Sequence, residues 1–357
     1  MKTILLDNKV ISNDMLNICK SLQCYQKLFS KKIFITGSTG MLASYLVTYL
    51  IFLNEKYNAN IEIYAGARSK KKLFARFGNY INKSYFHSIF NDINQPIVIE
   101  DKLDYIIHAA SLASPQYYEK MPIEVAMPNV IGTYHLLNMA KEHQVDKFLF
   151  FSSGDVYGKV APRIENIDEK IVGVMDPLDM HSCYGESKRM GETWCASFAR
   201  ECNIPVNIAR IGHTYGPTMD VENDPRVFAS FMKSILQGKD IVMLSDGTAK
   251  RPFCYVADAV VAFFLILLKG KSGEAYNVCN TKEFLSISEL ANILVKIRPE
   301  LDLKVVKKER SKNELYLENK LNVANKPVEY KLNELGWKCM YSTLEGFRSV
   351  YKWLRDK

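Results

Sequence analysis

A short apolar run that ends in closely spaced glycines is the feature that most constrains the fold of this chain. Residues 33–35 are apolar, Gly37 and Gly40 follow at once, and residues 41–53 are again mostly apolar. This order predicts a buried strand, a tight turn and a buried helix. A strand, a glycine turn and a helix in succession are typical of a dinucleotide-binding unit.

Each small residue of this segment has its own physical role. Gly37 permits the tight bend, and Gly40 lets backbone approach a pyrophosphate at the helix N-terminus, where unpaired N–H groups point outward. Ala43 stands where a third small residue allows the helix to pack closely on the strand. The dinucleotide contacts predicted here are Gly37, Ser38, Thr39, Gly40, Met41 and Leu42.

Later strand-like segments, such as residues 88–92, 103–108 and 147–151, are separated by helical stretches. This alternation predicts an α/β fold with a doubly wound parallel sheet of the Rossmann type. Ligands of such sheets bind at the carboxyl ends of the strands. The residues expected to meet the dinucleotide there are Asp92, Ile93, Ala109, Ala110, Ser111 and Asn129.

Two of these positions have a specific expected partner. Asp92 is placed to accept a hydrogen bond from an adenine amino group, and the small residues 109–111 lie where a nicotinamide ribose would be. Asn129 follows Pro128 and is predicted to start a helix.

Tyr184 and Lys188 are four residues apart, a spacing that places two side chains on one face of a helix. The ammonium is expected to lower the phenol pKa from about 10 toward neutrality. Such a tyrosine can take the proton of an alcohol that loses hydride. Ser153, delivered by the strand at 147–151, is expected to hold the same hydroxyl. For the four-residue spacing of Tyr184 and Lys188 alone, the alternative is a tyrosine packed in the core beside a solvated lysine. The glycine turn earlier in the chain favours the catalytic interpretation.

Further motifs lie at residues 113–115, 182–189, 209–217, 251–258 and 335–337. With them, nearly the whole chain after the first thirty residues resembles the extended short-chain dehydrogenase/reductases that modify nucleotide sugars. Within that family it is most similar to the UDP-glucuronate decarboxylases (UDP-xylose synthases). The resemblance implies an NAD(P)-dependent enzyme with a Rossmann domain and a smaller mixed α/β substrate domain.

The resemblance also implies a reaction through transient oxidation of a sugar at C4. Tyr184, Lys188, Ser153 and Asp155 are then the expected catalytic residues. Tyr184 and Lys188 are also expected to contact the dinucleotide, with Lys188 orienting its ribose. A 4-keto sugar can lose carbon dioxide, lose water across C5–C6, or take hydride back on the other face. Because the chain is most similar to the decarboxylases, decarboxylation is the first expectation, and 4,6-dehydration and 4-epimerisation remain alternatives.

Three positions depart from the pattern of the relatives. Asp155 stands where decarboxylases and dehydratases usually have Glu, and it is either an acid–base group near C5 or C6 or a cap of the strand end. Gly154 replaces an Asp acid of the deoxythymidine-linked dehydratases, which argues against that type of dehydratase. His213 replaces an Asn that commonly touches the pyrophosphate, and it is either a donor to substrate or a core histidine.

Arg68 bears on the choice between NAD and NADP. It stands at the end of the second predicted strand, where NAD-using relatives commonly have an acidic residue. A carboxylate binds the ribose 2′-hydroxyl of NAD, whereas an arginine suits the 2′-phosphate of NADP. The sequence therefore favours NADP over NAD. The lysines at 70–72 are interpreted as a solvated face.

The expected substrate contacts are Ser114, His213, Arg226 and Arg251. A guanidinium fork suits phosphate oxygens, so Arg251 is predicted to grip the pyrophosphate, or the uronate carboxylate in a decarboxylase. Arg226 is predicted to help hold the nucleotide. A surface ion pair is the alternative for both arginines.

Composition limits the remaining possibilities. The net charge is +8, but the basic residues are spread and no aromatic stacking motif or zinc spacing accompanies them, so nucleic acid and metal are not expected partners. The eight cysteines form no Cys-x-x-Cys pair, which predicts reduced thiols and a cytoplasmic protein. The apolar run 259–268 has about half the length of a membrane span and is predicted to be a buried helix.

The predicted organisation is an extension at 1–30, a dinucleotide domain at 31–215 and a nucleotide-sugar domain at 216–357, with segments that interleave. A helix within residues 15–28 is expected to pack on the sheet. The resemblance further implies a homodimer formed by the helix after Pro128 and the helix that contains Tyr184. A cofactor-binding sensor or scaffold without turnover is the alternative class, since a fold does not determine a function.

Overall fold

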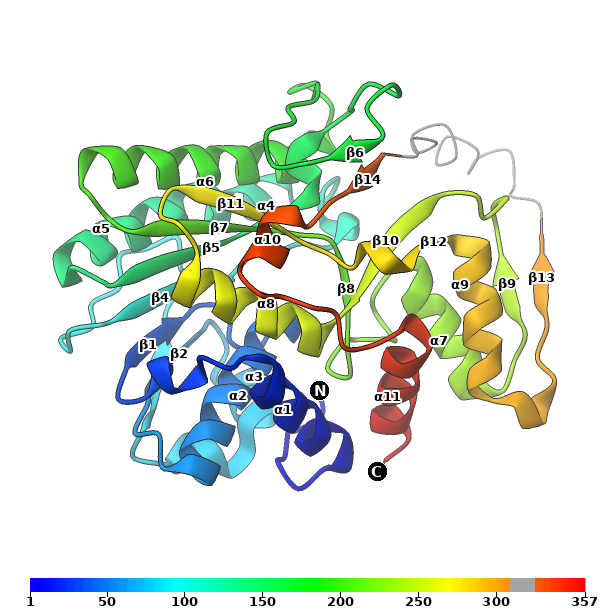
Figure 1. Cartoon of the computed structure of the whole chain (residues 1–357), viewed down its shortest axis with the longest axis horizontal. Coiled ribbons are helices and arrows are strands. Elements are labelled where there is room, and N and C mark those ends of the chain that lie inside the picture. Colours follow the sequence, from blue (N-terminus) through cyan, green and yellow to red (C-terminus); the bar gives the residue numbers. More distant parts are fainter. Residues whose placement is uncertain (309–324, 357) are drawn as a thin grey trace.

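A seven-stranded parallel sheet lies at the centre of the molecule (Figure 1). The structure is a computed structural model, and it describes residues 1–308 and 325–356. The strands are β1 (Lys32–Ile35), β2 (Glu62–Ala67), β3 (Phe86–Phe90), β4 (Tyr105–His108), β5 (Lys147–Ser153), β7 (Val206–Ile211) and β11 (Glu274–Val278). Their order in the sheet is β11-β7-β5-β4-β1-β2-β3, so the direction of winding reverses between β1 and β4.

Helices cover both faces of this sheet. On one face lie α2 (Met41–Tyr57), α3 (Lys70–Phe77) and α8 (Val256–Lys269), and on the other lie α4 (Pro122–Met127), α5 (Thr133–His143) and α6 (Ser182–Glu201). Side chains alternate along β5, where Phe148 and Phe150 face the second layer and Leu149 and Phe151 face the first. The predicted doubly wound α/β fold is confirmed.

The helix predicted from residues 41–53 is α2, and the apolar run 259–268 lies within α8. These two helices pack against each other as well as on the sheet. Their central residues are buried all round, which explains why both segments are apolar without a polar face. In the described part of the chain, none of the helices is long and apolar enough to cross a membrane.

A smaller unit is built around a mixed three-stranded sheet of β8 (His213–Tyr215), β10 (Lys250–Tyr255) and β12 (Phe284–Ser286). Its helices are α7 (Val227–Gln237), α9 (Ile287–Leu294), α10 (Tyr330–Glu334) and α11 (Thr343–Arg355). Two parallel pairs, β6 (Asn166–Ile167) with β14 (Lys326–Pro327) and β9 (Ile241–Met243) with β13 (Val305–Lys307), complete it. The predicted range 216–357 includes residues 309–324 and 357, which lie outside the described residues, and β11 from this range joins the main sheet.

Two predicted helices differ from the observed ones. The expected helix within 15–28 is α1 (Lys9–Ser21) followed by a 3-10 turn at Tyr25–Leu28, and it packs on α8 rather than on the sheet. Asn129 does not start a helix, because α4 already begins at Pro122 and continues into α5 through a π-helical turn at Pro128–Gly132. Pro128 is accommodated there since the wider turn relieves the lost backbone hydrogen bond.

The N-terminal extension is fixed to the rest of the molecule by one buried carboxylate. Asp14 of α1 accepts hydrogen bonds from the hydroxyls of Tyr45 at 2.9 Å, Tyr255 at 2.7 Å and Tyr341 at 2.8 Å. These tyrosines come from α2, from the end of β10 and from the segment before α11. Burial raises the pKa of Asp14 to about 6, although the three hydroxyls lower it. The carboxylate therefore joins three distant parts of the chain.

Stability should depend on pH through Asp14. Its pKa is higher in the folded protein than in the unfolded chain, so its contribution is present near pH 4 and is lost as the pH rises through about 6. We expect the free energy of unfolding of the wild type to fall by about 2 kcal/mol more than that of Asp14→Asn between pH 4 and pH 7. Urea titrations followed by circular dichroism measure this difference.

Asp7→Asn is the control, because Asp7 is an exposed aspartate of the same extension. Its pH curve should run parallel to that of the wild type. If the curve of Asp14→Asn also ran parallel to that of the wild type, the pKa of Asp14 would be the same in the folded and the unfolded states, which would contradict the prediction.

Candidate active site

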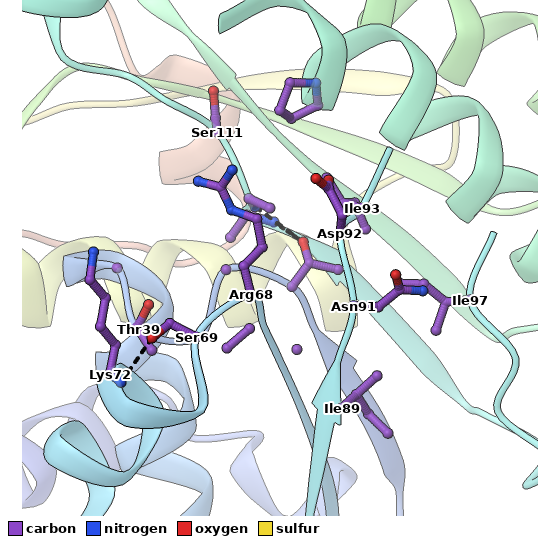
Figure 2. Close-up of a pocket in the computed structure, with 18 of the residues that line it drawn as sticks. Thr39, Arg68, Ser69, Lys72, Ile89, Asn91, Asp92, Ile93, Ile97 and Ser111 are labelled. Atoms are coloured by element: carbon purple, nitrogen blue, oxygen red, sulfur yellow. Dashed lines mark hydrogen bonds between the residues drawn. The ribbon is translucent and has the colours of Figure 1, made fainter. Parts of the chain in front are cut away.

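A cavity of about 510 Å³ opens at the carboxyl ends of β1, β2, β3 and β4 (Figure 2). Its volume lies in the range of small-molecule sites, roughly 300–1,000 Å³. It is located where the strand order reverses, which is where doubly wound sheets bind their ligands. Of the residues predicted to bind a dinucleotide, it is lined by Gly37, Thr39, Gly40, Arg68, Asp92, Ile93, Ala109, Ala110 and Ser111.

The glycine turn fits a pyrophosphate. Gly37 has a positive φ of 66°, and a Cβ on it would lie 2.8 Å from the Cα of Ala110, so only glycine allows β1 and β4 to approach this closely. Gly40 is the N-cap of α2, and no side chain caps the N–H groups of the first turn. These groups and the helix dipole are therefore available to an anion. The buried hydroxyl of Ser111 also has no partner among the described residues.

Positive charge is concentrated at one end of this cavity. Figure 2 shows the Arg68 side chain extending into the cavity, with Lys72 and Ser69 beside it on the rim. Ser69 caps α3 by accepting a hydrogen bond from the Lys72 backbone N–H at 3.2 Å, which holds the first turn of α3 at the cavity. Asp92 lines the same cavity, and its carboxylate accepts from the Asn94 backbone N–H at 3.0 Å. The sequence analysis missed Lys72, although Ser69 as an N-cap predicts this helix start.

Six predicted cofactor residues do not line the cavity, namely Ser38, Met41, Leu42, Asn129, Tyr184 and Lys188. The Ser38 hydroxyl is buried and donates to the Ile35 carbonyl, and Met41 and Leu42 lie in the first turn of α2. The Asn129 amide is completely buried and donates to the Val125 carbonyl and to the Ser187 hydroxyl, each at 3.0 Å. The Asn129 amide nitrogen thus connects α4 to α6, while its oxygen has no partner among the described residues, and the contact with a dinucleotide stays a prediction.

The structure brings Tyr184, Lys188 and Ser153 together. α6 packs against β5, so that Tyr184 and Lys188 on the helix meet Ser153 at the strand end. Both α6 side chains are buried, and the Lys188 Nζ lies 5.7 Å from the centroid of the Tyr184 ring. Ser153 lies close enough to the Tyr184 hydroxyl to lower its pKa by hydrogen bonding. This is an arrangement for moving a proton to or from a sugar hydroxyl.

Lys188 is not among the groups that lower the pKa of Tyr184 in the free protein, and its predicted effect on the phenol stays a prediction. Burial and the nearby Asp155 raise the pKa of Tyr184, and only Ser153 and Arg226 oppose them. Lys188 donates to the Phe151 carbonyl at 2.6 Å, and burial lowers its pKa to about 7. The spacing of the two residues was predicted correctly, but their burial, which the sequence does not specify, outweighs the attraction between them.

A second group of predicted residues surrounds Asp155. Asp155 is reached by solvent, yet the protein around it raises its pKa, and the nearby Arg251 opposes this rise. Within the described residues, its carboxylate has no hydrogen bond or ion pair. Burial lowers the pKa of His213 to about 3, and Arg251 and Arg226 lower it further, so the imidazole is neutral. A free carboxylate, a cation and a neutral donor thus lie near Tyr184.

Arg226 and Ser114 have different surroundings. Arg226 forms an ion pair with Asp224, with its Nε donating at 2.9 Å, and its guanidinium lies 4.7 Å from the Phe228 ring centroid. The ion pair was the alternative given for this residue, and it leaves part of the guanidinium available at the start of α7. The Ser114 hydroxyl is buried without a partner among the described residues, which suits a contact with a ligand.

Tyr118 is a neighbour of Tyr184 that the sequence analysis missed. The two rings stack with centroids 5.2 Å apart and planes 13° apart. Tyr118 follows residues 113–115 through a 3-10 turn at Pro115–Tyr117. The turn after Pro115 predicts that this segment folds back, but the contact with Tyr184 depends on how α4 packs on α6.

Comparison with known proteins agrees with this geometry. Residues 33–279 match the model of the "NAD dependent epimerase/dehydratase family". This chain belongs to that family. UDP-glucuronic acid decarboxylase 6 of Arabidopsis thaliana is 32% identical over 277 residues, which are 77% of this chain and 77% of the relative. The N-terminal extension lies outside the segment that the family model matches.

Solved structures of similar fold bind nicotinamide dinucleotides. UDP-glucuronic acid 4-epimerase from Bacillus cereus in complex with NAD is 23% identical, with a TM-score of 0.72 over 91% of this chain and 96% of the other. RMD from Pseudomonas aeruginosa complexed with NADPH is 23% identical, with a TM-score of 0.69 over 90% of this chain and 99% of the other. The predicted family, the enzyme class and the nicotinamide dinucleotide are therefore confirmed. The chain is a nucleotide-sugar-modifying enzyme of the epimerase/dehydratase family.

No group of three or more residues suitable for a metal ion occurs in the described ranges 1–308 and 325–356.

Proposed function

We propose that this enzyme decarboxylates a nucleotide-linked uronic acid, with UDP-glucuronate as the first candidate. The observation that supports this most is Asp155, an unpaired carboxylate facing Arg251 beside Tyr184 and Ser153. A cation at this position suits a substrate that has a carboxylate of its own. The similarity to UDP-glucuronic acid decarboxylases over 77% of the chain supports the same substrate.

The dinucleotide is proposed to lie across the cavity at the strand ends. Its pyrophosphate fits the turn at Gly37 and the N-terminus of α2, and its adenosine end fits the side with Arg68 and Asp92. When bound, it supplies a hydride acceptor beside the reacting sugar and later returns the hydride.

Tyr184 is the proposed acid–base group at the sugar C4 hydroxyl. Its deprotonated phenolate oxygen takes the C4 proton as C4 becomes a ketone and so becomes the phenol, while Ser153 positions the same oxygen by hydrogen bonding. Lys188 lies beneath the phenol ring and stabilises the phenolate that must be present before the C4 proton arrives. The buried, stacked position of Tyr184 against Tyr118 excludes water from the proton's path.

Decarboxylation follows from the chemistry of the ketone. A carboxylate at C5 next to a C4 ketone is a β-keto acid, whose carbon–carbon bond breaks as carbon dioxide leaves and an enolate forms. Arg251 is proposed to hold the carboxylate before the bond breaks, and Asp155 to deliver a proton to C5 afterwards. The raised pKa of Asp155 supports its role as a proton donor.

Mass spectrometry of purified enzyme with UDP-glucuronate and either NAD⁺ or NADP⁺ tests this function. We expect a product lighter by one carbon dioxide, with no net change in the oxidised dinucleotide. Tyr184→Phe should abolish turnover, by more than about 100-fold, because the C4 proton has no acceptor. It should bind the dinucleotide within a few-fold of wild type, since the phenol ring remains.

Other outcomes would assign another function. Loss of water from a UDP- or deoxythymidine-linked hexose would identify a dehydratase, and a product of equal mass but new retention time would identify an epimerase. Stoichiometric NADPH oxidation would identify a reductase. Near-full activity of Tyr184→Phe would contradict the catalytic role of Tyr184. If none of these nucleotide sugars were converted, a binding protein without turnover would be favoured.

We propose NADP as the preferred cofactor. The guanidinium of Arg68 extends into the cavity, and Lys72 adds a second cation at the rim, which together suit a 2′-phosphate. We expect Arg68→Gln to weaken NADP⁺ binding about tenfold or more and to leave NAD⁺ binding within about twofold, as measured by isothermal titration calorimetry. Lys71→Gln is the control, because Lys71 is exposed on α3 and does not line the cavity. Equal loss for both dinucleotides would contradict the assignment.

We propose a homodimer formed by α5 and α6. Tyr134 of α5 is 41% exposed and packs on Trp194 and Phe198 of α6, with ring centroids 5.3 Å and 6.0 Å away. An exposed aromatic cluster on two paired helices suits a self-complementary interface. Light scattering at micromolar concentration should give about twice the chain mass of 40.9 kDa, and a monomer mass would contradict the proposal. The cytoplasmic location expected from the cysteines stays a prediction.

A further inference from the structure

Lys188 is a buried ammonium that has no carboxylate in direct contact. Its side chain is 3% exposed, its Nζ donates to the Phe151 carbonyl at 2.6 Å, and it lies 4.9 Å from the Phe150 ring centroid. None of the ion pairs among the described residues includes it. Burial lowers its pKa to about 7, so its charge near neutral pH depends on weaker, more distant interactions.

Glu192 is placed to exert such an interaction. It lies four residues after Lys188 on α6, on the same face of the helix. Its carboxylate accepts from the Ser152 hydroxyl at 2.6 Å and from Arg210 at 3.0 Å (Nε) and 2.7 Å (Nη2). The carboxylate raises the pKa of Lys188 against the larger effect of burial.

Arg210 of β7 keeps this carboxylate in one place. The side chains of both partners are 14% exposed, and the guanidinium binds both carboxylate oxygens. Arg210 also donates to the Glu169 carbonyl at 2.9 Å and lies 4.9 Å from the Tyr157 ring centroid. A bidentate pair with this many contacts has little freedom to move. The distance between Glu192 and Lys188 is therefore fixed by the fold.

The other titratable groups around Lys188 are neutral. His108 of β4 is buried, and its pKa is lowered to about 3 by burial and then by Lys188. Its ring nitrogens lie 3.0 Å from the Thr36 hydroxyl and 3.0 Å from the Pro128 carbonyl. Burial raises the pKa of Tyr184 and of Cys195, both on α6. Glu192, together with the Arg210 that holds it, is thus the charged group that faces Lys188 in the described part of the chain.

We propose that Glu192, held by Arg210, is a positioning residue that sets the charge of Lys188 and thereby the pH range in which Tyr184 works. The link to Tyr184 rests on the proposed function, but the link between Glu192 and Lys188 does not. Through Ser152, the same carboxylate ties the end of β5, where Ser153 lies, to the helix that bears Tyr184 and Lys188.

The test is the titration of Lys188 in the free protein. Carbon-13 NMR of lysine-labelled protein follows its Cε resonance, which is assigned by its loss in Lys188→Met. We expect a midpoint more than about two pH units below the ordinary value of about 10.4 in the wild type. In Glu192→Gln, which keeps the shape and one accepting oxygen but replaces the other by an NH2 that cannot accept from Arg210 Nη2, we expect the midpoint to fall by a further ~1 pH unit.

Two variants separate charge from packing. Glu192→Asp keeps the charge and should stay closer to the wild-type midpoint than Glu192→Gln. Glu186→Gln removes a carboxylate of the same helix that is more exposed and pairs with Arg189, and it should leave the midpoint unchanged. Wherever a substrate is turned over, the alkaline limb of the pH profile of kcat/KM, which reports the free enzyme, should move to lower pH in Glu192→Gln in parallel with the NMR midpoint.

The proposal is overturned by a wild-type midpoint near 10, or by a Glu192→Gln midpoint equal to that of the wild type. An equal fall in Glu192→Asp and Glu192→Gln would overturn it too, since it would assign the effect to packing. The NMR titration needs no substrate or cofactor. A failure to decarboxylate UDP-glucuronate would therefore leave this result intact, and the two proposals fail separately.

Discussion

The burial of both faces of the parallel sheet is the constraint on which the active site depends. Because α2 and α8 cover one face and α5 and α6 cover the other, the sheet is open to a ligand at its strand ends rather than on its faces. The reversal between β1 and β4 then opens a gap at one point of that edge, and Gly37 keeps the gap narrow by its contact with Ala110. The dinucleotide cavity and the Tyr184 cluster are consequences of this one arrangement.

What could be predicted from the sequence was what local spacing determines. The strand, glycine turn and helix of residues 32–57 follow from periodicity and from the properties of glycine, and so does the pairing of Tyr184 with Lys188 on one helix face. The start of α4 at Pro122 was missed, because a π-helical turn lets the helix pass through Pro128, where a boundary is the usual result. Lys72 was missed because its neighbours are solvated, and only the Ser69 cap turns it toward the cavity.

The electrostatics of the site could not be predicted in this way. Four-residue spacing predicts attraction between Lys188 and the Tyr184 phenolate, but the sign of each pKa change depends on how deeply the two groups are buried. Packing of α6 on β5 and stacking of Tyr118 bury both, so the neutral forms of phenol and amine are favoured in the free protein. A ligand that brings charge and hydroxyl groups into this cluster changes that balance. The free enzyme thus holds a proton-transfer pair whose charges develop when substrate and dinucleotide are bound.

Residues outside the catalytic motifs fix the side of the site that contains Arg251 relative to the side that contains the glycine turn. Tyr45 belongs to the helix that begins at the glycine turn, and Tyr255 ends β10, the strand that contains Arg251. Both hydroxyls donate to the carboxylate of Asp14, which lies in the extension before the family-matched segment. A shift of the substrate side relative to the dinucleotide side would break a buried, charge-assisted hydrogen bond. The extension therefore helps to fix the position of β10, which contains Arg251, relative to the helix that follows the glycine turn.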